Sequence, residues 1–555
     1  MKRRNLGIAL LIVCGMALSG IGQVPPPDTG KMSWDLFQAV SEMEHRSATG
    51  QEVEAITAFF LAREPLTSDQ AQALSELGYS LVGSYGRFAL VSAPGTLYSD
   101  PQRGVGKLDF VANATLPPAC ISSDYHTEGV KAMGADAAHQ LGHTGQGTKI
   151  AIIDGGFDSE NAILQEISPH YCKVRPDAEN PGRYFADEDE VAANEPHGTS
   201  CAIIAADVAP EAELYLLSFE PESSLIGWLF AIHYAAVQLD VDVISSSVEF
   251  LYPTCHADGT GPLNSDVETI LAGTDAIMVL ASGNWAMGSG ADRTVYGGEF
   301  SDSDGDFAHD FAPESADAWD RNGLRFHARQ DDRIAIVLEW DDWDRELGRV
   351  DLDLIVSYDE YEHKVSGAQA QQLERSGIPA EILSTTIPYT GYYSLSVEDR
   401  AAKWHDRAVC SVSFHINLRN QTHPFEFVEH HTPGESVREV ATSSTVLSVG
   451  AVSLQDETQL PYSSRGPTSD GRSKPDLCGP SGVTGTCYDV FHGTSAAAPY
   501  VAAAFAVLKS AFPEMSADEL QQHMIDTAAC SIDGHGNRIC VVNLEAALTG
   551  GGEEP

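Results

Sequence analysis

The sequence predicts an α/β protein: a three-layer core with a mostly parallel sheet, interrupted by an inserted antiparallel β-sandwich and preceded by a small α+β unit. Continuous apolar runs such as 149–153 and 276–280 are typical of parallel strands buried on both faces, and helical segments separate them. Between about residues 289 and 425 apolar side chains recur at every second position, which predicts strands with one buried face. Before the core, a strand-like run at 56–61 and a capped helical pattern at 67–78 predict the small unit.

These patterns divide the 555 residues into six segments. They are a leader (1–22), the α+β unit (23–121), the first part of the core (122–289), the inserted β-sandwich (290–425), the second part of the core (426–548) and a flexible tail (549–555).

The leader has the features of a secretory signal peptide. Three basic residues precede an apolar run, Leu6 to Leu18, and small residues follow it. The run is too short to cross a bilayer. The alternative is a lipoprotein anchored at Cys14, although Val13 stands where such a site needs a small residue. We therefore expect a secreted protein, extracellular or periplasmic.

The charge balance restricts the partners. The chain has 80 acidic and 33 basic residues, a formal net charge of −47. Phosphate and anionic lipid surfaces require clustered Lys and Arg, so we expect neither nucleic-acid binding nor stable membrane insertion. The expected partners are protein or peptide substrates, and the expected state is a monomer.

The cysteines suggest disulfides in an exported protein. Ten are present, and removal of the leader takes Cys14 and leaves an odd number. The pairs closest in sequence, Cys478 with Cys487 and Cys530 with Cys540, are the predicted disulfides. Cys201, next to small residues, is the expected buried free thiol.

Three short motifs place reactive groups beside glycine. Asp154 ends a buried strand, His197 begins an apolar helix, and Ser495 begins another helix whose first turn is expected to include Pro499. Separately they are ordinary: a helix cap, a packed histidine and an N-cap serine. Together they supply what nucleophilic catalysis needs, because serine requires a base and the base requires a carboxylate. Asn284, after another buried strand, is either a turn residue or a donor to an oxyanion.

The segments IAIIDGG, HGTSCA, ASGN and HGTSAAAP resemble, in this order, the signatures of the subtilisin-like serine peptidases. The resemblance implies that Asp154 orients the base, His197 is general base and acid, Ser495 is the nucleophile and Asn284 is the oxyanion donor. The general base must be neutral, so activity is expected to rise through about pH 6–7.

The same resemblance implies a substrate-binding edge strand at 243–249, to which the substrate adds as a β-strand. Ser247, Val248, Glu249 and Gly283 are the expected substrate-binding residues. Glu249 stands where the family usually has glycine. Two alternatives follow: the carboxylate attracts a basic side chain at P1, the residue on the amino side of the scissile bond, or it points to solvent.

In layout, residues 23–121 resemble the family's propeptide, with maturation near 120–125; a retained accessory domain is the alternative. The insert resembles modules that bind substrate, surfaces or calcium. The turn 302–306 is compatible with a structural calcium ion or is a solvated Asp-rich turn. The chemistry requires no cofactor, and no catalytic metal is expected.

Two functions of different class remain at this point. The first is a secreted serine endopeptidase made as a self-processed zymogen. The second is a catalytically idle surface or matrix binding protein that acts through its β-sandwich. A lipase or esterase of the α/β-hydrolase type is disfavoured, because Ser495 lies in Gly-Thr-Ser-Ala-Ala and the order Asp, His, Ser does not fit that fold.

Overall fold

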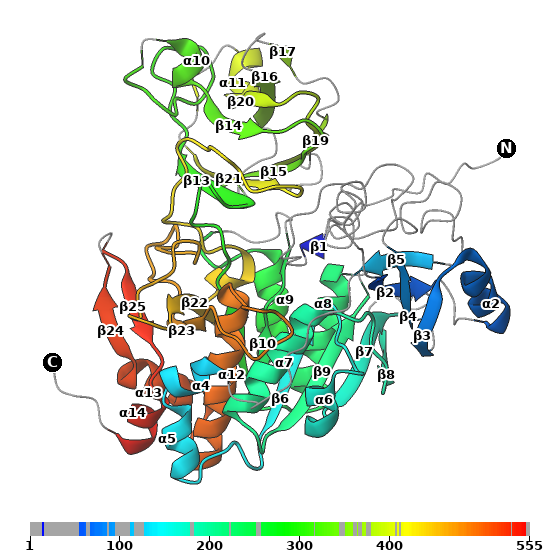
Figure 1. The fold of residues 1–555 in the computed structure, drawn as a ribbon. Helices are drawn as coiled ribbons and strands as arrows, with labels where there is room; N and C mark the ends of the chain where they lie inside the picture. The colour runs from blue at the N-terminus through cyan, green and yellow to red at the C-terminus, as the bar shows by residue number, and fades with distance from the viewer. Residues whose placement is uncertain are drawn as a thin grey trace, which may run out of the picture. The chain divides into compact units, whose positions relative to one another are not determined.

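The computed structural model divides into two compact units (Figure 1). One comprises Met1–Ala17, Cys120–Arg419 and Phe425–Pro555, and the other comprises Leu18–Ala119 and Asn420–Pro424. The structure describes residues 14–15, 55–62, 67–85, 88–94, 111–115, 127–177, 183–220, 224–250, 257–315, 317–342, 350–358, 363–364, 369–372, 379–405, 408–409, 412–533 and 536–550. The predicted leader falls almost entirely outside these residues.

The core of the larger unit is a ten-stranded sheet in the order β24-β25-β23-β22-β12-β10-β6-β9-β7-β8. Only the pairs β7·β8 and β24·β25 are antiparallel. The strands are β6 (Lys149–Asp154), β7 (His170–Pro176), β8 (Tyr184–Glu188), β9 (Glu213–Phe219), β10 (Val243–Ser246), β12 (Ile277–Ala281), β22 (Leu447–Ser453), β23 (Leu477–Ser481), β24 (Ala529–Ile532) and β25 (Arg538–Val541). The predicted runs 149–153 and 276–280 are confirmed as β6 and β12.

Helices cover both faces of this sheet, because alternate side chains of each strand enter different layers. Ile152 packs with α7 and α12, whereas its neighbour Ile153 packs with α8 and α9. The predicted three-layer arrangement is therefore confirmed. The helices are α4 (Glu128–Ala132), α5 (Ala135–Gln140), α6 (Ala162–Ile167), α7 (Pro196–Val208), α8 (Ser224–His233), α9 (Pro262–Leu271), α12 (Thr494–Ala511), α13 (Ala517–Thr527) and α14 (Leu544–Thr549). A π-helical turn (Tyr234–Gln238) follows α8, and a 3₁₀ turn (Glu439–Thr442) precedes β22.

Between β12 and β22 the chain forms two antiparallel sheets, ordered β13-β21-β15-β19-β18 and β14-β20-β16-β17. The large side chains Phe326, Tyr393 and Phe414 are fully buried between them. Along β16 buried and partly exposed residues alternate, as the period-two pattern predicts. The elements are β13 (Arg293–Glu299), α10 (Ala318–Arg321), β14 (Leu324–Ala328), β15 (Arg333–Trp340), β16 (Leu352–Tyr358), β17 (His363–Lys364), β18 (Gln369–Gln372), β19 (Ala380–Thr386), β20 (Gly391–Asp399), α11 (Arg400–His405) and β21 (Ser413–Asn420).

The smaller unit is a four-stranded antiparallel sheet, β3-β4-β2-β5, with one helix. The helix begins where predicted, since Thr67 and Gln70 form a capping box, and Gly78 ends it in a left-handed conformation. The elements are β2 (Ala55–Ala62), α2 (Ser68–Leu77), β3 (Ser80–Tyr85), β4 (Phe88–Pro94) and β5 (Val111–Thr115). The sequence analysis does not predict the last strand, VANAT, because two alanines and an asparagine, which are uncommon in strands, make up most of it.

One predicted disulfide is confirmed and one is wrong. Cys530 on β24 and Cys540 on β25 are bonded. Cys478 and Cys487 are not joined. They lie on opposite sides of the core sheet: Cys478 packs with Val452 and Ile539, and Cys487 belongs to the α7–α12 layer. The thiol of Cys201 is buried and free, as predicted.

Two further findings concern a short strand pair and the search for membrane-spanning helices. β1 (Cys14–Gly15) pairs antiparallel with β11 (Glu249–Phe250). Among the described residues no helix combines the length and the hydrophobicity that crossing a membrane would need.

Candidate active site

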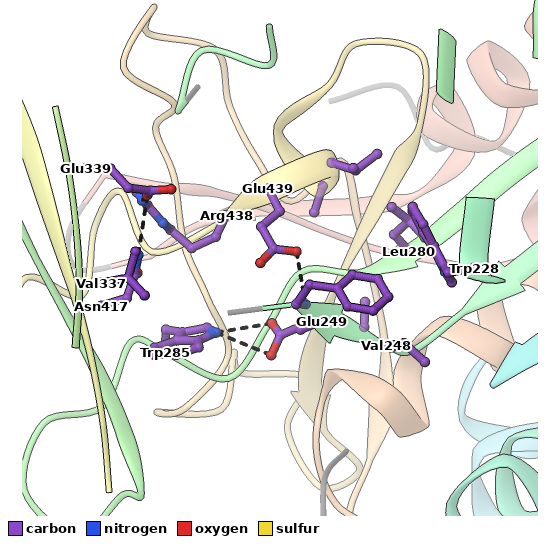
Figure 2. Close-up of a pocket in the computed structure, with 14 residues that line it drawn as sticks. Trp228, Val248, Glu249, Leu280, Trp285, Val337, Glu339, Asn417, Arg438 and Glu439 are labelled. Atoms are coloured by element: carbon purple, nitrogen blue, oxygen red, sulfur yellow. Dashed lines mark hydrogen bonds and ion pairs between the residues drawn. The ribbon is translucent and has the colours of Figure 1, made fainter. Parts of the chain in front are cut away.

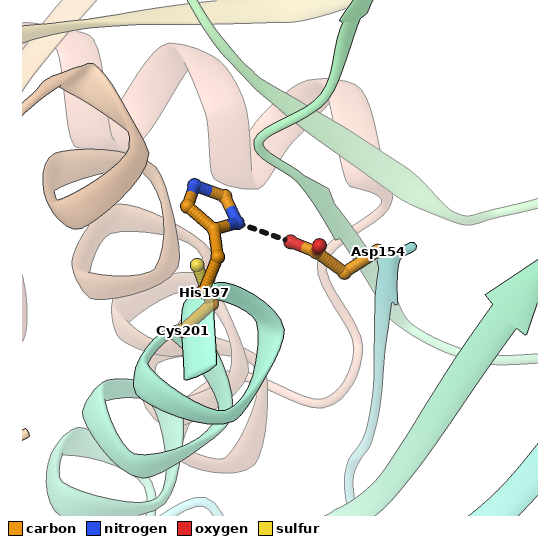
Figure 3. A group of neighbouring side chains, drawn as sticks. All are labelled: Asp154, His197 and Cys201. Atoms are coloured by element: carbon orange, nitrogen blue, oxygen red, sulfur yellow. Dashed lines mark hydrogen bonds and ion pairs between the residues drawn. The ribbon is translucent and has the colours of Figure 1, made fainter. Parts of the chain in front are cut away.

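The carboxyl end of β6 and the first turn of α7 bring Asp154 and His197 together (Figure 3). Asp154 Oδ2 lies 2.8 Å from His197 Nδ1, and both side chains are buried. The other carboxylate oxygen accepts a hydrogen bond from the Gly155 amide at 2.8 Å, which fixes the rotamer of Asp154. The carboxylate therefore selects the tautomer with a proton on Nδ1 and leaves Nε2 as the basic nitrogen.

His197 Nε2 is buried and has no hydrogen-bond partner within the described part of the chain. The ring of Phe491 packs edge-on against the imidazole, with centroids 5.6 Å apart. A buried nitrogen left without a partner is costly unless another molecule or a reacting group uses it. His197 Nε2 is therefore the atom of this site that can take up a proton.

Ser495 is the second residue of α12, where backbone N–H groups have no partner within the helix. Contrary to the sequence expectation, Pro499 lies inside the helix and not in its first turn. Proline has no N–H, so the carbonyl of Ser495 loses its usual donor four residues ahead. Ser247 Oγ (3.1 Å) and Cys201 Sγ (3.5 Å) bond this carbonyl instead. The proline thus allows two other segments to hold the serine.

Asn284 lies three residues after β12 and faces the start of α12. Its Oδ1 accepts hydrogen bonds from the backbone N (3.0 Å) and the hydroxyl (3.3 Å) of Thr494. The Nδ2 group is therefore the hydrogen-bond donor of this side chain. A Cβ on Gly493 would lie 3.3 Å from that Nδ2 and 3.6 Å from the Ser495 amide nitrogen. Gly493 also has φ +108°, which disfavours other residues. The absent side chain leaves a space between two N–H donors that suits a small anion.

Several residues that bond the backbone at Gly493 and Gly283 have no predicted role in the sequence analysis. Tyr462 accepts the Gly493 N–H at 3.1 Å and shares a hydrogen bond with Ser481, whose hydroxyl donates to the Gly493 carbonyl at 3.0 Å. Ser464 Oγ accepts the Trp285 N–H, and its own N–H donates to Gly283. Tyr462 and Ser464 lie in the segment YSSRGP, residues 462–467, whose sequence does not reveal these contacts.

Glu195, at the N-cap of α7, is a second group that the motifs did not reveal. Burial, with the nearby charge of Asp154, raises its pKa to about 7, although His197 opposes this. The pKa of His197 is also affected: burial alone would lower it, but Asp154 and Glu195 outweigh burial and raise it. The base of this site is therefore expected to lose its proton above the ordinary histidine range.

The first half of the expected substrate-binding segment, 243–249, is an interior strand of the sheet and not an edge strand. β10 (Val243–Ser246) pairs with both β6 and β12. Its extension from Ser247 onward is not part of this sheet, because the pairing of β10 with β6 and β12 ends at Ser246. Ser247 contacts the carbonyl of Ser495, so this extension lies beside the serine.

Glu249 neither points to solvent nor carries a free charge. Its carboxylate accepts hydrogen bonds from Trp285 Nε1 (3.2 and 3.3 Å) and Arg293 Nη1 (3.1 Å). A Cβ on Gly283 (φ +100°) would lie 2.3 Å from Glu249 Oε1, so glycine is needed there. Glu249 already has a cationic partner in Arg293, which it shares with Asp292, and this arrangement speaks against attraction of a basic P1 side chain.

The Asp-rich turn of the insert brings Asp302, Asp304 and Asp306 close together. Asp302 accepts backbone N–H groups of its own turn, Asp304 pairs with Arg321, and Asp306 accepts from Asn322. Because the protein's own donors engage all three carboxylates, we assign no metal to this turn.

The family model that matches is that of the Subtilase family, over residues 145–301 and 420–547. These residues are more than half of the chain and include all four signature segments. The chain belongs to the subtilase family. It is a subtilisin-like serine endopeptidase, and peptides are its substrates. The stretch between the two matched parts, 302–419, contains β14 to β20 and most of β21 of the inserted sandwich.

One solved structure shares this fold with a TM-score above 0.5. The structure of the Clostridium perfringens CspB protease matches with a TM-score of 0.52 and 17% identity, over 76% of this chain and 98% of that chain. The crystal structure of MycP1 with the N-terminal propeptide removed matches with a TM-score of 0.36 and 15% identity, over 78% of this chain and 98% of that one.

Proposed function

We propose that this subtilase is a secreted endopeptidase that acts through Asp154, His197 and Ser495, with an acyl-enzyme intermediate. The observation that most supports this is the 2.8 Å contact between Asp154 and His197 Nδ1, which leaves the buried Nε2 without a partner. The contact of Cys201, one turn beyond His197 on α7, with the Ser495 carbonyl links this helix to the serine.

In the proposed reaction His197 Nε2 takes the proton of Ser495 Oγ while Oγ bonds to the peptide carbonyl carbon. The electron pair of the C=O bond moves to oxygen, where Asn284 Nδ2 and the Ser495 N–H donate hydrogen bonds. When the C–N bond breaks, Nε2 gives its proton to the leaving amine. Water then attacks the ester with the same base, which releases the carboxylic acid and restores Ser495.

We further infer that the protein is exported and made as a self-processed zymogen in which residues 23–121 are a propeptide. The basic residues and apolar run of the leader support export, and so does the disulfide Cys530–Cys540. The propeptide role is supported by the compact sheet and helix of the smaller unit. We expect the mature enzyme to begin near 120–125 and to act as a monomer.

The test compares the wild type with Ser495→Ala by intact mass, with a fluorophosphonate probe added to both. Wild-type protein should lose the segment before about residue 122 and take up one probe, while Ser495→Ala should do neither. Ser531→Ala, on the exposed strand β24, is the matched control and should behave as wild type. Labelling that persists in Ser495→Ala would contradict the assignment of the nucleophile.

A further inference from the structure

The inserted sandwich reaches the substrate side of the core, where a cavity is lined by residues of both (Figure 2). The core contributes Val248, Leu280 and Trp285, and the insert contributes Val337, Glu339 and Asn417. Val337 and Glu339 belong to β15, and Asn417 belongs to β21. The insert therefore forms one wall of this cavity.

The cavity begins beside the groups that hold the reacting carbonyl. Val248 directly follows Ser247, which bonds the carbonyl of Ser495. Ala281 and Trp285 line the cavity and flank the turn that carries Asn284. The substrate strand is expected to lie along 243–249, and Val248 and Glu249 of that segment line the cavity. The side chain on the amino side of the scissile bond is therefore the one expected to enter here.

The carboxylates Glu249 and Glu339 of the cavity already have cationic partners. Arg293, which also pairs with Asp292, pairs with Glu249, and Arg438 pairs with Glu339. Burial, followed by the nearby charge of Glu249, raises the pKa of Glu439 well above its ordinary range, which favours the uncharged form of this carboxyl. The carboxyl accepts the Phe250 N–H at 3.1 Å. A charged side chain would find no free counter-ion among the described lining residues, and its burial would be costly.

Two polar atoms of the lining lack hydrogen bonds. Arg438 Nη1, a donor, and Asn417 Oδ1, an acceptor, are buried without partners. Both side chains contact the same oxygen of Glu339: Arg438 through Nη2 and Asn417 through Nδ2 at 3.4 Å. The side chain of Arg438 is only 9% exposed. Buried groups of this kind cost free energy until a partner satisfies them.

We propose that this cavity receives the P1 side chain and selects a carboxamide, that of glutamine or asparagine. The carboxamide oxygen accepts from Arg438 Nη1, and its NH₂ group donates to Asn417 Oδ1. A carboxylate has no donor for Asn417, an ammonium has no acceptor for Arg438, and leucine satisfies neither. The inference rests on the proposed function, and it makes the insert a specificity element of the protease.

The experiment measures kcat/KM for peptides that differ only at P1, with Gln, Asn, Glu, Lys and Leu. The better carboxamide should exceed leucine by about tenfold or more, because a site built for hydrogen bonds rejects a side chain that leaves them unmade. Asn417→Leu should reduce this ratio about tenfold. The control Asn322→Leu makes the same change elsewhere in the insert and should leave the ratio unchanged.

Fluorophosphonate labelling separates the outcomes, because it counts competent active sites. If labelled wild type prefers leucine or lysine, and Asn417→Leu does not alter the profile, the cavity proposal is wrong while the proposed function stands. If wild type is not labelled, the proposed function fails and this inference fails with it. If only Asn417→Leu is unlabelled because it misfolds, the smaller Asn417→Ala replaces it. It also removes the acceptor oxygen and should likewise lose the carboxamide preference.

Discussion

The core sheet and the inserted sandwich place polar groups near the substrate in different ways. In the core, Asp154 ends β6, Ser247 follows β10 and Asn284 follows β12, so the groups gather where parallel strands end. In the insert, Glu339 and Asn417 come from within antiparallel strands and project from a sheet face. Parallel strands thus bring polar side chains together at one edge of the sheet, whereas the antiparallel sheet presents them on its face, as one side of a cavity.

This difference suggests a division of work between the two regions. In the proposed reaction, groups at the strand ends of the core contact the atoms that react. In the proposed P1 site, groups on the sheet face of the insert contact the part of the substrate that distinguishes one peptide from another. Substitutions in the core should therefore change the rate with every substrate, and substitutions in the insert should change the ratio between substrates.

The largest effect that sharpens this comparison is expected from Asn284→Leu. Removal of one oxyanion donor in subtilisin costs about 10²–10³ in kcat, and we expect the same order here, with little change in KM. Steady-state kinetics with several P1 side chains would measure it. Asn537→Leu, in the turn between β24 and β25, is the control. A loss confined to one P1 side chain would break the comparison.

A smaller effect is expected from Glu195→Gln. His197 must be neutral to act as base, and its raised pKa places the rising limb of activity above about pH 6.5. Glu195 contributes to that rise when ionised, so its neutralisation should move the limb to lower pH. The pH dependence of kcat/KM measures this shift. The exposed Glu190→Gln should leave the limb in place, and an optimum near pH 4 in wild type would contradict the mechanism.

The smallest effect concerns the insert alone. Burial, followed by the charges of Asp353 and Asp351, raises the pKa of Glu381 from 4.5 to about 8, although the Leu354 N–H opposes this. The folded insert then binds a proton that the unfolded chain releases, so its stability should fall as pH rises from about 4.5 through about 8. In the inactive Ser495→Ala background, Glu381→Gln should flatten this dependence in thermal melts. An unchanged slope would show that Glu381 titrates normally.

The sequence predicted those parts of the fold that depend on local patterns. The period of two gave the sandwich strands, continuous apolar runs gave β6 and β12, and Thr67 with Gly78 gave the ends of α2. Motif order predicted that Asp154, His197, Asn284 and Ser495 share one site. In the structure Asp154 contacts His197, and Asn284 contacts Thr494, the neighbour of Ser495.

The parts that failed depend on contacts between distant segments. Nothing near Cys478 or Cys487 reveals that they lie on opposite sides of a sheet. The pairing of Glu249 with Arg293 spans the start of the insert, so neither alternative for Glu249 anticipated it. Pro499 was placed in the first turn because proline favours that position, whereas the helix accommodates it by bonding Ser495 to Ser247 and Cys201.

Because two other segments bond the Ser495 carbonyl, we expect activity to depend on complete folding of the core. The first turn of α12 does not secure the serine by itself, because Pro499 leaves the carbonyl without an intrahelical donor. Its anchors come from α7 and from the residue that follows β10, which lie 294 and 248 residues earlier in the chain. A newly made chain that has formed only its local helices would carry the serine without its alignment, and so would remain harmless to itself and to its neighbours until the distant segments meet.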